Sequence, residues 1–181
     1  YSGEGWNASV AVSERPNGTR NYHNAGKVQA SSEPQDMRLQ RMLGHLTTLV
    51  PTLAKRVVVI GCGAGVTAGA VSIDPAVEHE TIAEIEPLVP QVVSRHFAGV
   101  NHDVLSNPKV HVRIDDARHF LATTTERFDA ITPACLLALS LIGVFFIYSA
   151  QHARDEADWI KQLVWLGLGL VVYVTTSQLD Y

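Results

Sequence analysis

The sequence has few cysteines and no excess of basic residues, and both absences exclude classes of protein. Only Cys62 and Cys135 are cysteines among 181 residues, which excludes a small fold held together by disulfides. Fourteen Lys and Arg stand against 18 Asp and Glu without a basic cluster, so we expect no nucleic-acid partner. A hydrophobic share of 46% excludes a disordered chain.

The spacing of a metal site and a targeting leader are also lacking. His79-Glu80 begins a zinc-type motif, but no second histidine completes it, and the other histidines are not paired at ligand spacing. We therefore expect no metal. The chain begins at Tyr1 without a charged-then-apolar leader, so we expect no targeting peptide and interpret the chain as a fragment.

Charge is unevenly distributed along the chain. Residues 133–181 carry six charged side chains, whereas the first 132 residues carry 26. Two uncharged runs, 130–153 and 162–179, are each long enough for a helix that crosses a bilayer, and Trp159 and Trp165 bracket the start of the second. We predict a two-helix transmembrane hairpin over 133–181. The alternative is a pair of helices buried in a soluble core, which a chain this short could hardly cover.

The polar part begins with a strand-rich segment and a helix, which we assign to a first region over 1–52. Asn17-Gly18 is a strong hairpin turn signal between two alternating stretches, and Pro51 ends the helical pattern. The predicted elements are strands over 7–13, 19–23 and 27–30, with a second turn over 24–26, and an amphipathic helix over 37–49.

Over 53–132 the pattern changes to alternating strands and helices. A continuous apolar run, 56–60, is typical of a strand buried in a parallel sheet. We predict a partial nucleotide-binding α/β domain with a doubly wound, Rossmann-like sheet. The predicted strands are 56–60, 81–85, 110–114 and 128–131, and the predicted helices are 87–97 and 117–123.

Three glycines follow the first of these strands, at Gly61, Gly63 and Gly65. Because glycine has no Cβ, the backbone can turn sharply there and come close to a ligand. A helix begins directly behind them and offers free N–H groups. The alternative is a tight turn that binds no ligand.

Acidic residues end the next two predicted strands, at the same edge of the sheet. Glu84 can accept hydrogen bonds from both hydroxyls of a ribose, as the strand-end acid of a dinucleotide fold does. Asp115 and Asp116 can accept from an adenine amino group. The alternatives are Asp116 as a helix N-cap and Glu86 as a solvated acid. We favour an adenosine-type, small-molecule nucleoside ligand.

The spacing of the glycines narrows the choice of ligand. The sixth position of the dinucleotide fingerprint is Val66 instead of glycine, which disfavours NAD. Three alternating glycines followed by a strand-end acid resemble the class I S-adenosylmethionine-dependent (SAM-methyltransferase type) fold. That fold usually has an acid two residues before the first glycine, where this chain has Val59, and the difference indicates one branch of the superfamily.

Over about 1–132 the chain resembles that branch, the spermidine synthase-like polyamine aminopropyltransferases. The matching stretches, in the family's order, are 26–29, 36–45, the glycine loop, 83–86 and 114–117. The resemblance implies that Glu84 binds the ribose and that Asp116 and Ala117 flank the adenine. It also implies that Gln29 and His45 lie towards the substrate pocket. The donor would be decarboxylated S-adenosylmethionine, or S-adenosylmethionine itself, with no metal.

Two departures bear on catalysis. The family's glycine loop usually carries an aspartate where this chain has Ala64, which removes a contact to the donor's amine. The family's catalytic aspartate follows the fourth strand, where Thr132 leads into an apolar run. Aminopropyl transfer needs a carboxylate there to hold and deprotonate the amine. Asp129 lies at the wrong end of the strand, so we assign it a structural role and predict a transferase-like domain that is inactive as it stands.

Residues 133–181 resemble a different family, the RodA/FtsW-type cell-shape and cell-division proteins, over their first two membrane helices. The similarity lies at Tyr148-Ser-Ala150, at Lys161-Gln162 and over 178–181. It implies a lipid bilayer as partner, the bacterial inner membrane as location and a cytoplasmic N-terminal domain. That family's peptidoglycan glycosyltransferase loop would lie beyond residue 181.

Both resemblances are incomplete where they meet, between 132 and 133. We interpret this position as a junction of two partial genes. A fused spermidine synthase-like membrane protein is the alternative, although its membrane helices would be expected ahead of the nucleotide domain. Three functions stay open: an adenosyl-binding domain without transfer, a membrane fragment of a cell-wall glycosyltransferase, and a non-enzymatic anchored module.

The membrane prediction has a direct test. We expect the 181-residue chain to stay with the membrane fraction through a carbonate wash and to be extracted only by detergent, because two apolar spans hold it in the bilayer. Complete release by carbonate would contradict the prediction.

Overall fold

The computed structural model describes residues 1–132 together with Val164 and Gly167. Its N-terminal sheet follows from alternating apolar residues, since Val10 and Val12 are buried while Ser9, Ala11 and Ser13 lie on the other face. The sheet is antiparallel in the order β1-β2-β3-β4. Its strands are β1 (Ser2–Glu4), β2 (Ser9–Glu14), β3 (Arg20–Asn24) and β4 (Lys27–Ser31).

The turns of this sheet are those that the sequence predicts. Gly18 has a φ of 81°, and the Arg15 N–H donates to the Thr19 carbonyl at 2.8 Å, which closes the β2–β3 hairpin. Ala25 and Gly26 have φ values of 48° and 76° in the β3–β4 turn. The prediction missed β1, whose three residues contain no apolar side chain to reveal it.

Helix α1 (Pro34–Leu49) joins the N-terminal sheet to the second sheet and packs on helix α2 (Val66–Ser72). It begins three residues before the predicted start, with Pro34 in its first turn. A Cβ at Gly44 would lie 2.5 Å from the Thr67 carbonyl oxygen, so glycine at this position allows the two helices to approach closely.

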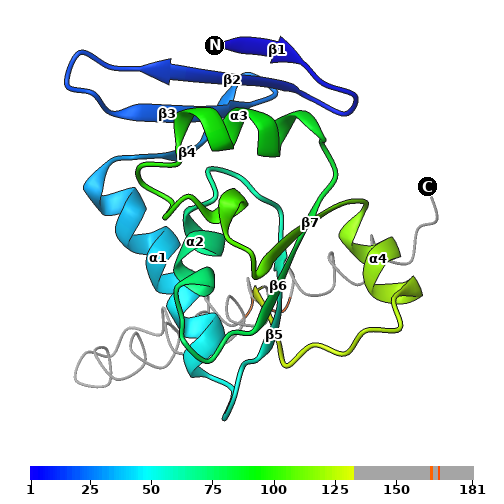
Figure 1. Cartoon of the computed structure of the whole chain (residues 1–181). Coiled ribbons are helices and arrows are strands. Elements are labelled where there is room, and N and C mark those ends of the chain that lie inside the picture. Colours follow the sequence, from blue (N-terminus) through cyan, green and yellow to red (C-terminus); the bar gives the residue numbers. More distant parts are fainter. Residues whose placement is uncertain (133–163, 165–166, 168–181) are drawn as a thin grey trace. The chain divides into compact units, whose positions relative to one another are not determined.

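The second sheet is parallel, in the order β7-β6-β5-β8, which confirms the predicted α/β class with a parallel sheet. Val57 and Val59 belong to a buried cluster with residues of α2 and α3, whereas Val58 clusters with Phe120 of α4. Helices α2 and α4 lie on opposite faces of the sheet (Figure 1). The remaining elements are β5 (Arg56–Ile60), β6 (His79–Glu84), α3 (Leu88–His96), the 3₁₀ helix η1 (Val104–Ser106), β7 (Val110–Ile114), α4 (Ala117–Thr123) and β8 (Ala130–Ile131).

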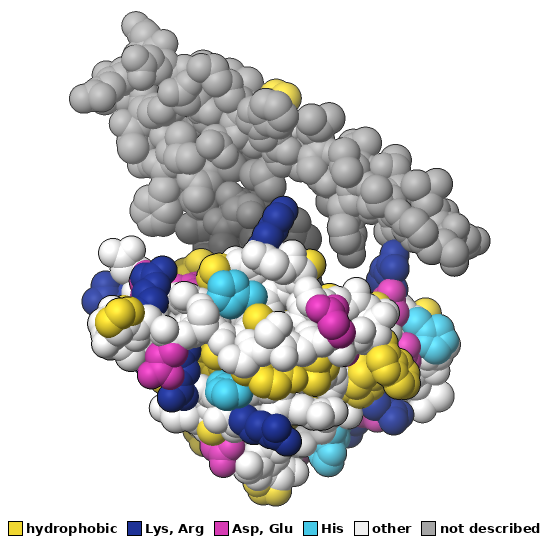
Figure 2. Space-filling model, turned by 90° about the horizontal axis from the view of Figure 1, so that it is seen from above, with side chains coloured by type: hydrophobic (Ala, Val, Ile, Leu, Met, Phe, Trp, Pro, Cys, Tyr) yellow, Lys and Arg dark blue, Asp and Glu magenta, His cyan; other side chains and the backbone are white. Residues whose placement is uncertain are grey.

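The two predicted regions, 1–52 and 53–132, share one hydrophobic core. Val10, Tyr22 and Met37 belong to the same buried cluster as Val57. The side of the N-terminal sheet seen from above mixes acidic, basic and histidine side chains (Figure 2). The sheet therefore covers the end of the parallel sheet and is not a separate module.

The predicted hairpin over 133–181 and the proposed junction at 132/133 lie outside the described residues. Within the part of the chain that the structure describes, no helix has both the length and the apolar content that a membrane crossing requires.

Glu80 is an unusual member of the core. It lies on β6, is 0% exposed, and neither carboxylate oxygen has a hydrogen-bond partner among the described residues. Burial raises its pKa to about 8, against a smaller opposite effect of Lys109. A carboxyl group of this kind favours its neutral form in the folded state.

We expect Glu80 to make stability fall as the pH rises. The folded state holds a proton that the unfolded state has lost between pH 4.5 and about 8, so the free energy of unfolding should decrease there by up to about 1.4 kcal/mol per pH unit. Urea denaturation of Glu80→Gln should show a flatter pH profile than the wild type. Glu78→Gln, at an exposed acid beside the same strand, should keep the wild-type slope. Equal slopes in wild type and Glu80→Gln would contradict this account.

Candidate functional site

The glycine loop between β5 and α2 has the conformation that its sequence predicts. Gly61, Gly63 and Gly65 have φ values of 79°, 52° and 76°, a left-handed region that side chains disfavour. A Cβ at Gly61 or Gly63 would meet no atom within 4 Å, so the backbone there is open to a ligand. The loop is anchored by the Gly61 N–H, which donates to the Ala83 carbonyl at 2.8 Å.

Glu84, at the end of β6, is hydrogen-bonded to this loop. One carboxylate oxygen accepts from the Cys62 N–H at 2.7 Å, and the other accepts from the Glu86 N–H at 2.9 Å. A carboxylate has about four acceptor positions, so about two stay available to a pair of hydroxyls. The structure therefore brings the predicted strand-end acid and the predicted glycine loop together.

Asn101 holds the glycine loop through a hydrogen bond, and no motif in the sequence predicted this contact. Its side-chain amide donates to the Ala64 carbonyl at 3.1 Å, and the residue is 1% exposed. Ala64, at the position of the family's aspartate, is itself buried and presents no charge. A Cβ at Gly65 would lie 2.7 Å from the Asn101 amide nitrogen. Gly65 is thus required by both its conformation and its neighbour.

Asp115 and Asp116 lie at the end of β7, next to the end of β6. The Asp115 N–H donates to the Glu84 carbonyl at 3.1 Å, and its carboxylate lies 3.0 Å from His119 Nδ1. Asp116 accepts from the Arg118 N–H at 2.8 Å as the N-cap of α4, which confirms that alternative. Hydrogen bonds from the Arg118 side chain and backbone lower its pKa to about 2. An adenine contact by Asp116 and Ala117 stays a prediction.

Glu86 is not the solvated acid that the sequence left open. It is 1% exposed, and its carboxylate accepts from the N–H groups of Asn7, Ala8 and Leu88 at 2.6, 3.3 and 3.0 Å. Burial acts to raise its pKa, but these hydrogen bonds outweigh burial and the pKa lies below the ordinary value. The interpretation was wrong because two of the three donors, at Asn7 and Ala8, lie almost 80 positions earlier in the chain.

Tyr22 extends the site from the N-terminal sheet. The residue is 2% exposed, and burial raises its pKa to about 12, against a smaller opposite effect of the hydrogen bond from Asn24 and with a smaller contribution from Glu84. Burial also raises the pKa of the Cys62 thiol. The thiol is therefore kept protonated, and Cys62 packs in the buried cluster instead of acting as a nucleophile.

The two predicted pocket residues lie on other elements and are exposed. Gln29 is on β4, and His45 is on α1. Hydrogen bonds from Thr48 and from the Ala76 backbone lower the pKa of Asp74, and His45 adds a smaller electrostatic effect in the same direction. Within the described part of the chain, no hydrogen bond joins Gln29 or His45 to Glu84, so their substrate role stays a prediction.

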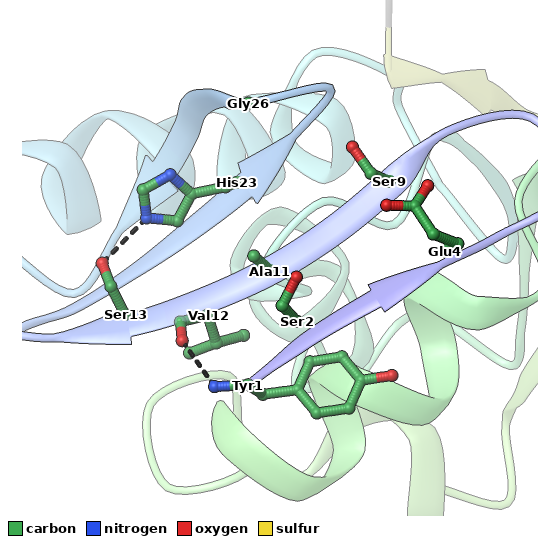
Figure 3. Close-up of a pocket in the computed structure, with 9 residues that line it drawn as sticks. All are labelled: Tyr1, Ser2, Glu4, Ser9, Ala11, Val12, Ser13, His23 and Gly26. Carbon is green, nitrogen blue, oxygen red and sulfur yellow. Dashed lines mark hydrogen bonds between the residues drawn. The ribbon is translucent and has the colours of Figure 1, made fainter.

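A hollow of the surface lies away from the glycine loop. It has a volume of about 330 Å³ and lies on the outer face of the N-terminal sheet (Figure 3). Ser13 and His23 meet there at 2.8 Å, both on the surface. Among the described residues, no three His, Cys, Asp or Glu side chains gather in a metal-binding arrangement.

Comparison with known proteins agrees with this fold. The spermine/spermidine synthase domain profile matches residues 36–154. The chain belongs to this family. Over 106 residues the domain is 32% identical to polyamine aminopropyltransferase 1 of Pseudomonas aeruginosa, covering 59% of this chain and 37% of that protein. It is 29% identical over 142 residues to the polyamine aminopropyltransferase of Yersinia pestis, covering 76% and 48%.

Solved structures show the same fold as this spermidine synthase-type domain. Spermidine synthase from Thermotoga maritima superposes with a TM-score of 0.65 at 21% identity, over 73% of this chain and 47% of that one. A spermidine synthase in complex with the transition state analogue AdoDATO gives the same score and identity. The chain spans less than half the length of these relatives. The family match continues beyond residue 132, and none of these proteins supports the RodA/FtsW resemblance.

Alanine substitutions at Gly61 and Gly65, which both have left-handed conformations, should differ in their cost to stability. Gly61→Ala should lower the free energy of unfolding by about 1–2 kcal/mol through conformation alone. Gly65→Ala should cost more, because the new Cβ also displaces the Asn101 side chain from Ala64. Gly99→Ala, at an open position with an ordinary φ, should change stability by less than about 0.5 kcal/mol. Equal losses at Gly61 and Gly65 in urea denaturation would show that Asn101 does not constrain the loop.

Proposed function

We propose that this domain binds the adenosyl part of decarboxylated S-adenosylmethionine, or of S-adenosylmethionine, at the carboxyl edge of the parallel sheet. The observation that carries the proposal is the bond between the Glu84 carboxylate and the Cys62 N–H of the glycine loop. It places a buried acceptor beside a backbone that Gly61 and Gly63 leave open. Ribose hydroxyls are the donors that such a pair of free acceptor positions fits.

The neighbouring strand end supports the assignment. The Asp115 N–H bonds to the Glu84 carbonyl, which fixes Asp116 and Ala117 one strand away from the ribose acid. An adenine whose ribose lies on Glu84 would extend towards these residues. The solved structure of a relative in complex with AdoDATO supports a ligand of this chemical class.

We further propose that binding occurs without aminopropyl transfer. After β8 the chain has Thr132, whose hydroxyl donates to the Val58 carbonyl at 3.0 Å, and no acid follows over 133–135. Asp129 accepts from the backbone N–H groups of Lys55 and Arg56, both at 2.9 Å, which confirms its structural role. Within the described residues 1–132, no carboxylate therefore follows β8 to deprotonate an attacking amine.

We also propose, independently of the ligand, that residues 133–181 attach the domain to a membrane. The proposal rests on the two uncharged runs of the sequence. It would hold the adenosyl-binding domain at the cytoplasmic side of a bilayer, as a non-enzymatic anchored module or as part of a cell-wall glycosyltransferase.

Calorimetric titration of the full chain with decarboxylated S-adenosylmethionine tests the binding proposal. We expect saturable heat from the wild type and a Kd raised about 10-fold or more in Glu84→Gln, because the amide removes acceptor positions for the ribose. Glu78→Gln, an identical change at an exposed acid before β6, should bind like the wild type.

Two outcomes would contradict the proposal. Absence of heat with the wild type would exclude an adenosyl ligand of this kind, and equal affinity in Glu84→Gln would remove Glu84 from the site. In the same preparations, spermidine formed from putrescine would show that transfer survives and would overturn that part of the proposal.

A further inference from the structure

The turn between β1 and β2, residues 5–8, wraps around one buried carboxylate. Glu86 accepts from the Asn7 N–H at 2.6 Å and the Ala8 N–H at 3.3 Å. The fit is close, since a Cβ at Gly5 would lie 2.3 Å from the Glu86 carboxyl carbon. The Asn7 side chain adds a bond to the Ile85 carbonyl at 2.8 Å. The turn is thus shaped around the residue that follows the end of β6.

Glu86 is also bonded to the predicted ribose acid. Its backbone N–H donates to Glu84 at 2.9 Å, while its side chain receives the N–H groups of the turn. One residue therefore holds the orientation of the Glu84 carboxylate and the position of the N-terminal turn. Movement of the turn away from Glu86 would disturb both sets of hydrogen bonds.

Electrostatics gives the reason for this arrangement. Glu84 and Glu86 are both buried, and a buried carboxylate needs N–H donors in place of the water that it loses. The turn supplies those donors to Glu86, and the Cys62 N–H supplies one to Glu84. An open turn would take two of these donors away from Glu86, and Glu84 shares the effect through the bond between them.

We propose that Glu86 is a positioning residue that couples the closed turn 5–8 to the binding of an adenosyl ligand at Glu84. The inference rests on the proposed function. Ligand binding fixes the Glu84 carboxylate, which favours the Glu86 geometry that holds the turn. By thermodynamic linkage, a closed turn favours the ligand by the same factor.

Hydrogen exchange on the full chain tests the coupling. Saturating decarboxylated S-adenosylmethionine should slow exchange of the Asn7 and Ala8 amides about 5-fold or more in the wild type, because both donate to Glu86 only in the closed turn. Amides at the centre of β2, such as that of Val12, should change less. A purely structural Glu86 would leave the turn amides unaffected by ligand.

Variants separate the side chain's role from the stability of the fold. Glu86→Ala removes the oxygen that accepts from both N–H groups of the turn, so we expect a Kd raised about 10-fold and no ligand effect on the Ala8 amide. Asn7→Ala removes only the bond to Ile85 and should shift both readouts less, in the same direction. Glu78→Gln should match the wild type in both.

The outcomes distinguish the coupling from the proposed function. If the wild type binds the ligand but the Asn7 and Ala8 amides exchange at unchanged rates, the coupling is wrong and the binding site stands. If the wild type binds no adenosyl ligand, the proposed function fails and the coupling fails with it. If Glu86→Ala does not fold, the wild-type exchange experiment alone decides.

Discussion

The hydrogen bond between the Glu84 carboxylate and the Cys62 N–H is the constraint on which the site depends. It joins the end of β6 to a glycine loop that follows β5, and parallel pairing of these two strands places its partners at one edge. The loop reaches this position only because Gly61, Gly63 and Gly65 adopt left-handed conformations. This hydrogen bond therefore depends both on the glycine conformations of the loop and on the pairing of β5 with β6.

The three acids on or just after β6 show how their surroundings set their roles. Glu80 is buried without a partner and is kept neutral, whereas Glu86 is buried among N–H donors and is kept charged. Glu84 has two backbone donors, which leave acceptor positions of its carboxylate unused by the described residues. The N-terminal sheet makes this difference, because its first turn supplies the donors to Glu86.

Local patterns predicted most of the fold. The apolar run of β5 and the N-cap and extent of α4 are visible in neighbouring residues, and the structure has them where they were predicted. The contacts of Glu86 and Asn101 were not predictable, since their partners lie about 80 and 37 positions away and carry no motif. Strand β1 was missed because it is a short edge strand without alternating apolar residues. The sequence pointed to Glu84 but could not show that its carboxylate also anchors the loop.

The central claim is that the Glu84 carboxylate accepts hydrogen bonds from ribose hydroxyls beside the glycine loop. Its most direct test compares the affinities of 5′-methylthioadenosine and its 2′,3′-dideoxy analogue for the wild type and for Glu84→Gln. The account predicts that loss of the hydroxyls weakens binding to the wild type about 10- to 100-fold and has little effect on Glu84→Gln. Equal binding of the two ligands by the wild type would contradict it.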